Sequence, residues 1–106
     1  MDRLSQVLNL LEKEPDDAFL NHALAMEYLA LGENGKAIAA MEHLLHKNPD
    51  HTGTYYHLGY AYLNGGEREK AIAIWEKGIA ECKTLRKQHH LAELQSALNE
   101  LIFEDD

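Results

Sequence analysis

The stretch LAMEYLALGENGKAIAAMEH at residues 24–43 returns 34 residues later as LGYAYLNGGEREKAIAIWEK at residues 58–77. The similarity extends outward to residues 16–49 and 50–83, and a repeat of this length indicates stacked supersecondary units. In each copy, apolar residues recur every three or four positions on both sides of a glycine, which predicts two helices joined by a short turn. The pairs identical in both copies are Asp16/Asp50, Leu24/Leu58, Tyr28/Tyr62, Leu29/Leu63, Gly32/Gly66, Glu33/Glu67, Lys36/Lys70, Ala37/Ala71, Ile38/Ile72, Ala39/Ala73 and Glu42/Glu76.

Residues that end or begin helices stand at the same places in both copies. Gly32 and the pair Gly65–Gly66 should end the first helix of each copy, because glycine tolerates the left-handed turn that follows a helix. Pro49 should stop the second helix after about Lys47. Short polar side chains can accept the free backbone N–H groups at a helix start. The caps we expect are Asp16 or Asp17, Asn34, and Asp50 or Thr52.

The flanks of the repeats each predict one more helix. Leu10, Leu11 and Pro15 precede Leu44, Leu45 and Pro49 by the same period of 34, so the first helix resembles the second half of a worn repeat. At the other end, the place of Pro49 is taken by Lys83, and the last helix suits a cap on a stack. Its apolar stripe is Leu91, Leu94, Leu98, Leu101 and Ile102, and its other face carries Glu93, Gln95, Ser96 and Glu100. The expected single domain, 1–106, divides into an N-terminal helix (1–15), repeats at 16–49 and 50–83, and a capping helix with an acidic tail (84–106).

The motifs Leu24-Ala25-x-x-Tyr28 and Leu58-Gly59-x-x-Tyr62, with Gly32/Gly66, Ala37/Ala71, Pro49 and Trp75, resemble the tetratricopeptide repeat (TPR). The resemblance is to short two-repeat proteins of bacterial type. It implies an all-α fold, a right-handed solenoid of antiparallel helix pairs. Small residues such as Ala25 and Gly59 let helices approach, and large ones such as Met41 and Trp75 fill the space beside them. Two departures are Asn21, where the second copy has Tyr55, and Gly78, where the family usually has alanine; glycine there should weaken the helix slightly.

The resemblance also implies a concave groove, lined by the first helix of each unit, that binds a peptide or helix of a partner protein. The groove positions carried over are Phe19, His22, Met26 and Leu29, then Gly53, Tyr56, Tyr60 and Asn64. The clamp with which some family members hold a C-terminal carboxylate is missing, because His22, Met26 and His57 stand at its lysine and asparagine positions.

Two alternatives stay open for this surface. Its aromatic and methionine residues could form an adaptable apolar platform, since these residue types are enriched at interfaces. The C-terminal helix could instead fold over them. A self-associating scaffold that pairs the same apolar surfaces, as a homodimer, is the alternative to a partner-binding adaptor.

Composition limits the other classes of function. The net charge of −8 argues against nucleic acid as a partner, since phosphate binding needs clustered cations. The one basic stretch, Lys83, Arg86 and Lys87, reads as a solvated helix connection. The sequence lacks a long apolar run and a signal peptide, and Cys82 is the single cysteine, so we expect no membrane contact and a cytoplasmic protein.

The sequence offers no candidate catalytic or metal centre. His43 and His46 share a helix face, as do His89 and Glu93, but neither pair belongs to a zinc motif, and Cys82 has no CxxC partner. Scattered surface histidines are therefore expected, with a pH-sensitive interface as the alternative. Phosphate loops and nucleophile elbows are also missing, so we expect no enzyme activity and no cofactor.

Overall fold

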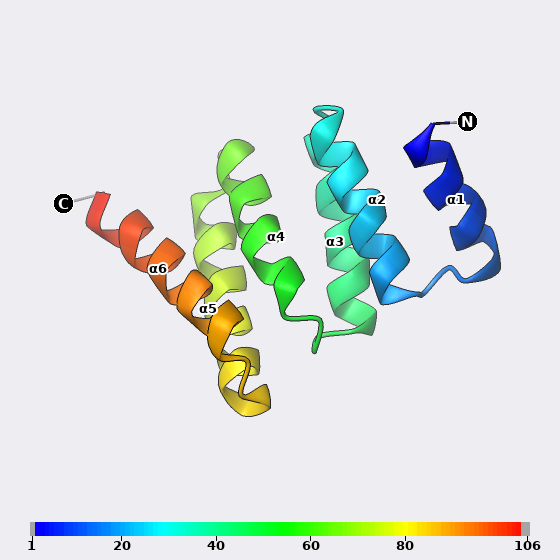
Figure 1. Ribbon diagram of the computed structural model, residues 1–106. Coiled ribbons are helices and arrows are strands. Elements are labelled where there is room, and N and C mark those ends of the chain that lie inside the picture. The colour runs from blue at the N-terminus through cyan, green and yellow to red at the C-terminus, as the bar shows by residue number, and fades with distance from the viewer. Residues whose placement is uncertain (1, 105–106) are drawn as a thin grey trace. The chain divides into compact units, whose positions relative to one another are not determined.

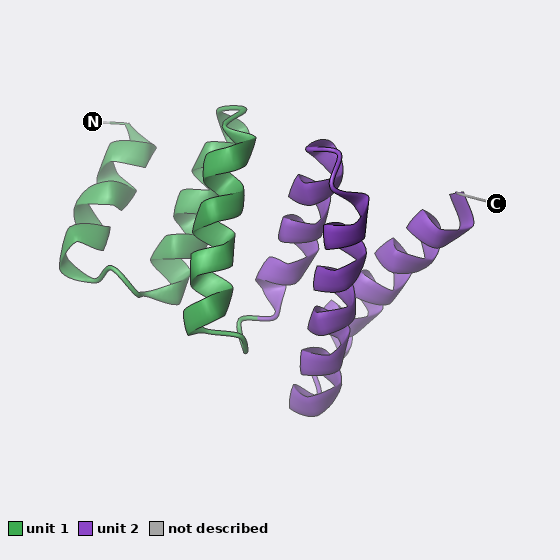
Figure 2. Cartoon of the chain, turned by 180° about the vertical axis from the view of Figure 1, so that it is seen from behind, with its two compact units in different colours: residues 1–51 green, residues 52–106 purple. Residues whose placement is uncertain are grey.

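The computed structural model describes residues 2–104, which form six α-helices and, within that range, no β-strand (Figure 1). The predicted all-α fold class is therefore confirmed. The helices group into two compact units, residues 1–51 and 52–106, which Figure 2 shows in separate colours. Of the helices described, none is both long and apolar enough to span a membrane.

The first unit contains α1 (Arg3–Lys13), α2 (Ala18–Ala30) and α3 (Asn34–Lys47). The last two form a helical hairpin, and α1 packs on α2. Leu44 in α3 is buried, whereas Leu10, its counterpart one period earlier in α1, is 54% exposed.

The second unit contains α4 (Gly53–Asn64), α5 (Arg68–Leu85) and α6 (Gln88–Glu104). Helices α4 and α5 repeat the hairpin of the first unit, and α6 packs against both of them. Without a proline at position 83, α5 continues for two residues beyond the repeat and ends in a left-handed residue, Arg86, at a φ of 59°.

The ends of α2 and α4 are built alike around a glycine with positive φ. Gly32, just after the C-cap of α2, has a φ of +75°, its N–H donates to the carbonyl of Leu29, and the N–H of Glu33 donates to that of Tyr28 at 2.9 Å. Gly66, just after the C-cap of α4, has a φ of +78° and the equivalent hydrogen bonds. This pair of hydrogen bonds is the Schellman motif, which favours glycine because a Cβ is strained there. The predicted helix stops are confirmed.

The predicted helix starts are only partly correct. Asp17 caps α2, and its carboxylate accepts the N–H of Leu20 at 2.8 Å. Asn34 lies inside α3, whose N-cap is Glu33, without a side-chain cap hydrogen bond. Thr52 is the N-cap of α4, but its hydroxyl is hydrogen-bonded to Nδ1 of His90 at 2.7 Å and makes no cap bond. A tertiary contact thus replaces the local one.

Trp75 is the centre of the second unit and is completely buried. Its indole N–H donates to the backbone carbonyl of Tyr56 at 3.3 Å, across the α4–α5 hairpin. A Cβ at Gly59 would overlap the indole ring, so the glycine is what allows the tryptophan. The prediction that Trp75 lies buried against small residues is confirmed.

Gly78 has a structural role that its helix propensity does not reveal. A Cβ at this position would lie 2.7 Å from Cβ of Tyr55 and 2.9 Å from Cδ1 of Leu94. Both neighbours are fully buried. The expectation that Gly78 merely weakens α5 was therefore incomplete, because the missing side chain is the space that Tyr55 and Leu94 occupy.

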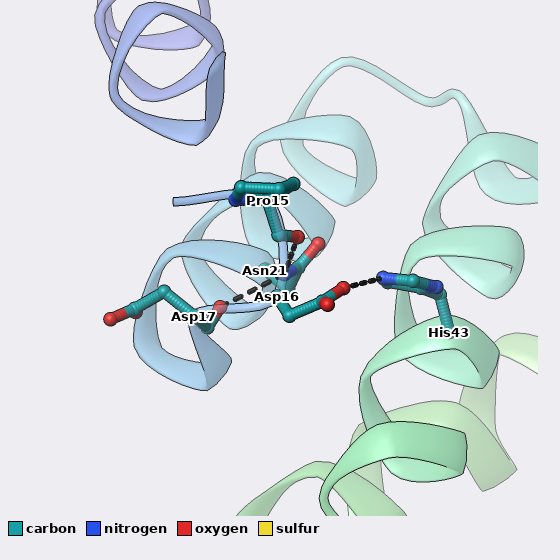
Figure 3. A network of polar contacts seen from close by, with 5 residues as sticks. All are labelled: Pro15, Asp16, Asp17, Asn21 and His43. Atoms are coloured by element: carbon teal, nitrogen blue, oxygen red, sulfur yellow. Dashed lines mark hydrogen bonds and ion pairs between the residues drawn. The ribbon is translucent and has the colours of Figure 1, made fainter. Parts of the chain in front are cut away.

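Asn21, the other departure from the repeat, holds the connection between α1 and α2 (Figure 3). Its side chain is 5% exposed and donates to the carbonyls of Pro15 at 3.0 Å and Asp17 at 2.9 Å. Next to it, the carboxylate of Asp16 lies 3.1 Å from Nε2 of His43 on α3. A polar network in unit 1 thus stands where unit 2 has a buried tyrosine.

The apolar stripe of α6 differs at its end from the prediction. Leu94 and Ala97 are buried, and Leu91, Leu98 and Leu101 are half-buried. Ile102, which we placed on the stripe, is 45% exposed. The buried face of α6 includes Ala97, a small residue that the prediction from the leucine spacing left out.

Candidate partner-binding surface

Tyr56 and Tyr60 lie one turn apart on α4, so both project from the same side of the helix. Their ring centroids are 4.9 Å apart in an edge-to-face arrangement, and the ring of Tyr60 is 5.0 Å from that of Trp75. Both tyrosines are half-buried. The aromatic pair is therefore anchored to the core on one side and open on the other.

Helix α6 supplies the opposite wall of a pocket of about 200 Å³. Ala97 is buried and faces the tyrosines, while Ser96 and Glu100 are exposed at the rim. The lining consists of Tyr56, Tyr60, Glu93, Ser96, Ala97 and Glu100. The C-terminal helix α6 therefore lies beside the tyrosines and leaves them partly accessible, and does not cover them completely.

A second, smaller hollow of about 50 Å³ also borders Tyr60. Glu100 and Ala97 line this hollow as well as the first. Its other lining residues are Leu63, Trp75, Leu101 and Glu104. Tyr60 therefore lines two hollows along the contact of α4 with α6.

Burial and negative charge both act on the phenol of Tyr60. Burial raises the pKa of Tyr60, and the neighbouring Tyr56, Glu100 and Glu104 raise the pKa further because each disfavours a phenolate. The phenol thus stays neutral, and its O–H is kept as a hydrogen-bond donor.

The pKa of His57, beside the pocket, is shifted in the opposite direction. Burial lowers the pKa of His57, and the negative charge of Glu93 partly offsets this effect. Its ring is 5.6 Å from that of Tyr56. Glu93 is shared with a second histidine, since Nε2 of the exposed His89 lies 3.8 Å from its carboxylate.

The N-terminus of α6 is anchored by the contact of His90 with Thr52. The imidazole of His90 also lies over Gly53, where a Cβ would be 3.4 Å from its ring. Gly53, predicted to line the groove, is therefore packed against α6. Cys82 is buried nearby, and burial raises the pKa of its thiol although a hydrogen bond with Thr52 opposes this.

The groove residues predicted in the first unit lie together on α2. Phe19 is 75% exposed, whereas Met26 and Leu29 are half-buried. The ring of His22 lies 5.5 Å from that of His51. On α4, Asn64 is exposed at the last helical position. These residues are accessible to different degrees, and Phe19 and Asn64 are the exposed ones.

The first unit also has an open, mostly apolar hollow of about 430 Å³. It lies between α2 and α3, and the ammonium of Lys36 at its edge is 5.8 Å from the centre of the Tyr28 ring. Its lining residues are Asn21, Leu24, Tyr28, Lys36, Ala39, Ala40 and His43.

The sequence pattern puts Glu93, Ser96 and Glu100 on the face of α6 that does not carry the apolar stripe, and their place in the pocket lining was not predicted. The signal was present: Glu93, Glu100 and Glu104 follow each other at spacings of seven and four, which places them on one side of a helix. Within residues 2–104, no three histidine, cysteine or carboxylate side chains are placed to share a metal ion. The basic residues Lys83, Arg86 and Lys87 are exposed at the α5–α6 connection.

A family model and a similar solved structure indicate the same protein family. The family model described as tetratricopeptide repeat matches residues 28–101. The solution structure of a tetratricopeptide repeat domain protein from Salinibacter ruber is 37% identical, with a TM-score of 0.78 over 82% of this chain and 88% of that one. No curated protein matches the chain.

Two more distant structures share the fold. The solution structure of protein BPP2914 from Bordetella parapertussis is 24% identical, with a TM-score of 0.84 over 99% of this chain and 91% of that one. The crystal structure of PcrH in complex with the chaperone binding region of PopD is 14% identical, with a TM-score of 0.87 over 97% of this chain and 78% of that one.

Proposed function

Because the chain belongs to the tetratricopeptide-repeat family, we propose that it is a non-catalytic module that binds a peptide or helix of a partner protein. The binding surface we propose is the side of α4 that carries Tyr56 and Tyr60, together with the adjoining face of α6. On α2, the side that carries Phe19, His22, Met26 and Leu29 would contribute further contacts, and Asn64 would lie at the end of the α4 surface.

The observation that carries this proposal is the half-exposed tyrosine pair at the mouth of a pocket. Tyr60 is held in place by its contact with the buried Trp75, so its ring is ordered before a partner arrives. Rigid aromatic side chains offer a large contact area at a small entropic cost, which is why they dominate the affinity of many interfaces. That PcrH, with the same fold, was crystallised with a region of PopD supports peptide binding by this architecture.

The test is capture of partners from the native cytoplasm, where we expect the protein to reside. A partner captured by the wild type should bind the Tyr56→Ala/Tyr60→Ala variant more weakly by about 2 kcal/mol or more. Circular dichroism should show unchanged helix content. The matched control is Lys83→Gln/Lys87→Gln, which alters exposed residues away from the pocket and should bind nearly as the wild type does. Normal binding by the tyrosine variant, with loss in the lysine variant, would place the surface elsewhere.

A second candidate is self-association into a homodimer. The observation that favours it is the exposure of Ile102 at 45% and Phe103 at 69%, on the last turn of α6. Sedimentation at micromolar concentration separates the two functions. A stable dimer that Phe103→Ser dissociates would support a scaffold, and a monomer would support the adaptor.

A further inference from the structure

The pocket beside Tyr56 and Tyr60 has a one-sided charge. Neither α4 (Gly53–Asn64) nor α6 (Gln88–Glu104) contains a lysine or arginine. The three acidic residues of α6 line the two hollows that border Tyr60: Glu93 the first, Glu104 the second, and Glu100 both. Their negative charge is therefore concentrated on the side that faces the tyrosines, and the helix itself supplies no compensating cation other than histidine.

The histidines next to the pocket compensate this charge poorly. His89 is exposed and reaches Glu93 at 3.8 Å, a long ion pair even when the imidazole is protonated. Burial favours the neutral form of His57 through its lowered pKa. In the part of the chain that the structure describes, no lysine or arginine forms an ion pair with Glu93 or Glu100.

Other tyrosines of the molecule show what such rings attract. The ammonium of Lys36 lies 5.8 Å from the centre of the Tyr28 ring, and that of Lys70 lies 5.9 Å from the Tyr62 ring. These are cation–π distances. Tyr56 and Tyr60 have no lysine or arginine above their rings among residues 2–104, although two carboxylates flank them.

We propose that the pocket formed by Tyr56, Tyr60, Glu93, Ser96 and Glu100 takes a lysine or arginine side chain of the partner segment. The inference rests on the proposed function and assigns a chemical class to its main contact. The aliphatic stem of the partner's residue lies along the tyrosine rings, and its charged end meets the two carboxylates. A volume of about 200 Å³ admits one long side chain and excludes a whole helix.

The geometry assigns separate tasks to the residues. The rings contact the stem and attract the cation through their faces, while Glu93 and Glu100 approach it from α6. The phenol oxygens and the hydroxyl of Ser96 can accept hydrogen bonds from an ammonium or guanidinium group. A neutral side chain of equal length would leave the carboxylates uncompensated, so the pocket selects for charge as well as for length.

The experiment uses three labelled amphipathic peptides that are identical except at one central residue, which is lysine, norleucine or glutamate. Fluorescence anisotropy with the full chain gives the Kd of each peptide. We expect the lysine peptide to bind about 10-fold more tightly than the norleucine peptide, and the glutamate peptide to bind most weakly. In Glu93→Gln/Glu100→Gln, the preference for lysine over norleucine should fall to about 2-fold or less.

The matched control is Glu69→Gln/Glu76→Gln, which changes the net charge equally at two exposed positions of α5. It should keep the preference for lysine, because salt-screened charges away from the pocket act weakly. Equal loss of preference in both double variants would show a general effect of net charge and would overturn the inference. A lysine preference that survives Glu93→Gln/Glu100→Gln would do the same.

The outcomes separate this inference from the proposed function. Lysine and norleucine peptides that bind equally, and that both lose affinity in Tyr56→Ala/Tyr60→Ala, would overturn the charged pocket and support the binding surface. Failure of all three peptides to bind would also overturn the inference. The proposed binding surface is overturned separately, by a captured cellular partner that binds the tyrosine variant normally.

Discussion

The two helical hairpins fill equivalent positions with different side chains. In unit 1 the facing positions carry Ala25 and Met41, and in unit 2 the same positions, one period later, carry Gly59 and Trp75. All four are buried. The larger side chain on α5 is matched by the removal of a methyl group from α4, because a Cβ at Gly59 would overlap the indole.

A second pair of positions shows the same exchange in the other direction. Unit 1 has the small polar Asn21 and the large Leu44, whereas unit 2 has the large Tyr55 and Gly78. Tyr55 occupies the space that a side chain at position 78 would need. The two repeats therefore differ by paired substitutions, in which a larger side chain at one position is matched by a smaller one at the position that it faces. A single position compared between the repeats then looks like a departure from the family pattern.

The largest effect that tests this comparison is the loss of the indole. Trp75→Ala should lower the free energy of unfolding by about 3–5 kcal/mol, because it leaves a cavity in the core of unit 2. The corresponding change in unit 1, Met41→Ala, should cost about 2–4 kcal/mol. Urea unfolding followed by circular dichroism measures both. A loss below about 1 kcal/mol for Trp75→Ala would contradict the burial described above.

The exchange itself can be tested by converting one pair into the other. Gly59→Ala alone should cost about 1–3 kcal/mol through overlap with Trp75. Adding Trp75→Met recreates the Ala–Met pair of unit 1, so the double variant should be more stable than the sum of the two single effects by about 1 kcal/mol or more. Additive effects in the double-mutant cycle would show that the two positions do not compensate each other.

Substitutions at two helix ends should have smaller effects on stability, with opposite signs. Gly66→Ala should lower the free energy of unfolding by about 1 kcal/mol, because alanine is strained at positive φ. Arg86→Gly should raise it by about 0.5–1 kcal/mol, since Arg86 is exposed and has a left-handed backbone at the end of α5. Thermal unfolding of both variants checks the two signs. A stabilising Gly66→Ala would contradict the strain that we infer at this turn.

The smallest effect is a pH dependence specific to unit 2. The pKa of His57 is lowered by burial, so below about pH 6.5 the unfolded chain binds a proton that the folded chain resists. The stability contributed by neutral His57 is thus present near pH 7 and declines as the pH falls. The slope of unfolding free energy between pH 7 and 5.5 should be shallower in His57→Gln. The control is His46→Gln, which removes an exposed histidine of α3.

Much of the fold could be predicted from the sequence because local rules and the repeat agree. Gly32 and Gly66 end helices at the expected turns, and Trp75 is buried as its position predicts. The N-cap of α3 is Glu33, one residue before the predicted Asn34, and Thr52 is the predicted N-cap of α4 but makes no capping hydrogen bond, because the capping rule considers only neighbouring residues. The hydroxyl of Thr52 instead contacts His90, which lies 38 residues away.

The candidate site was less accessible to prediction. Tyr56 and Tyr60 were identified through the resemblance to the family, but Glu93 and Glu100 were assigned only to the polar face of the last helix and not to the pocket that they line. The positions of the leucines alone did not predict which side of α6 faces the protein, because the small residue Ala97 is buried as well. Whether the predicted groove residues bind a partner stays a prediction.

The helices of each unit pack mainly on their immediate neighbours in the chain, and this affects how fast the protein can reach its fold. Within residues 2–104, the main contacts run from α1 to α2, α2 to α3, α4 to α5 and α5 to α6, and α4 also contacts α6. Few residues must be brought together across long loops, so little loop entropy is lost before contacts form. Helical proteins with such low contact order fold within microseconds to milliseconds. Each hairpin is therefore able to form while later helices are still leaving the ribosome.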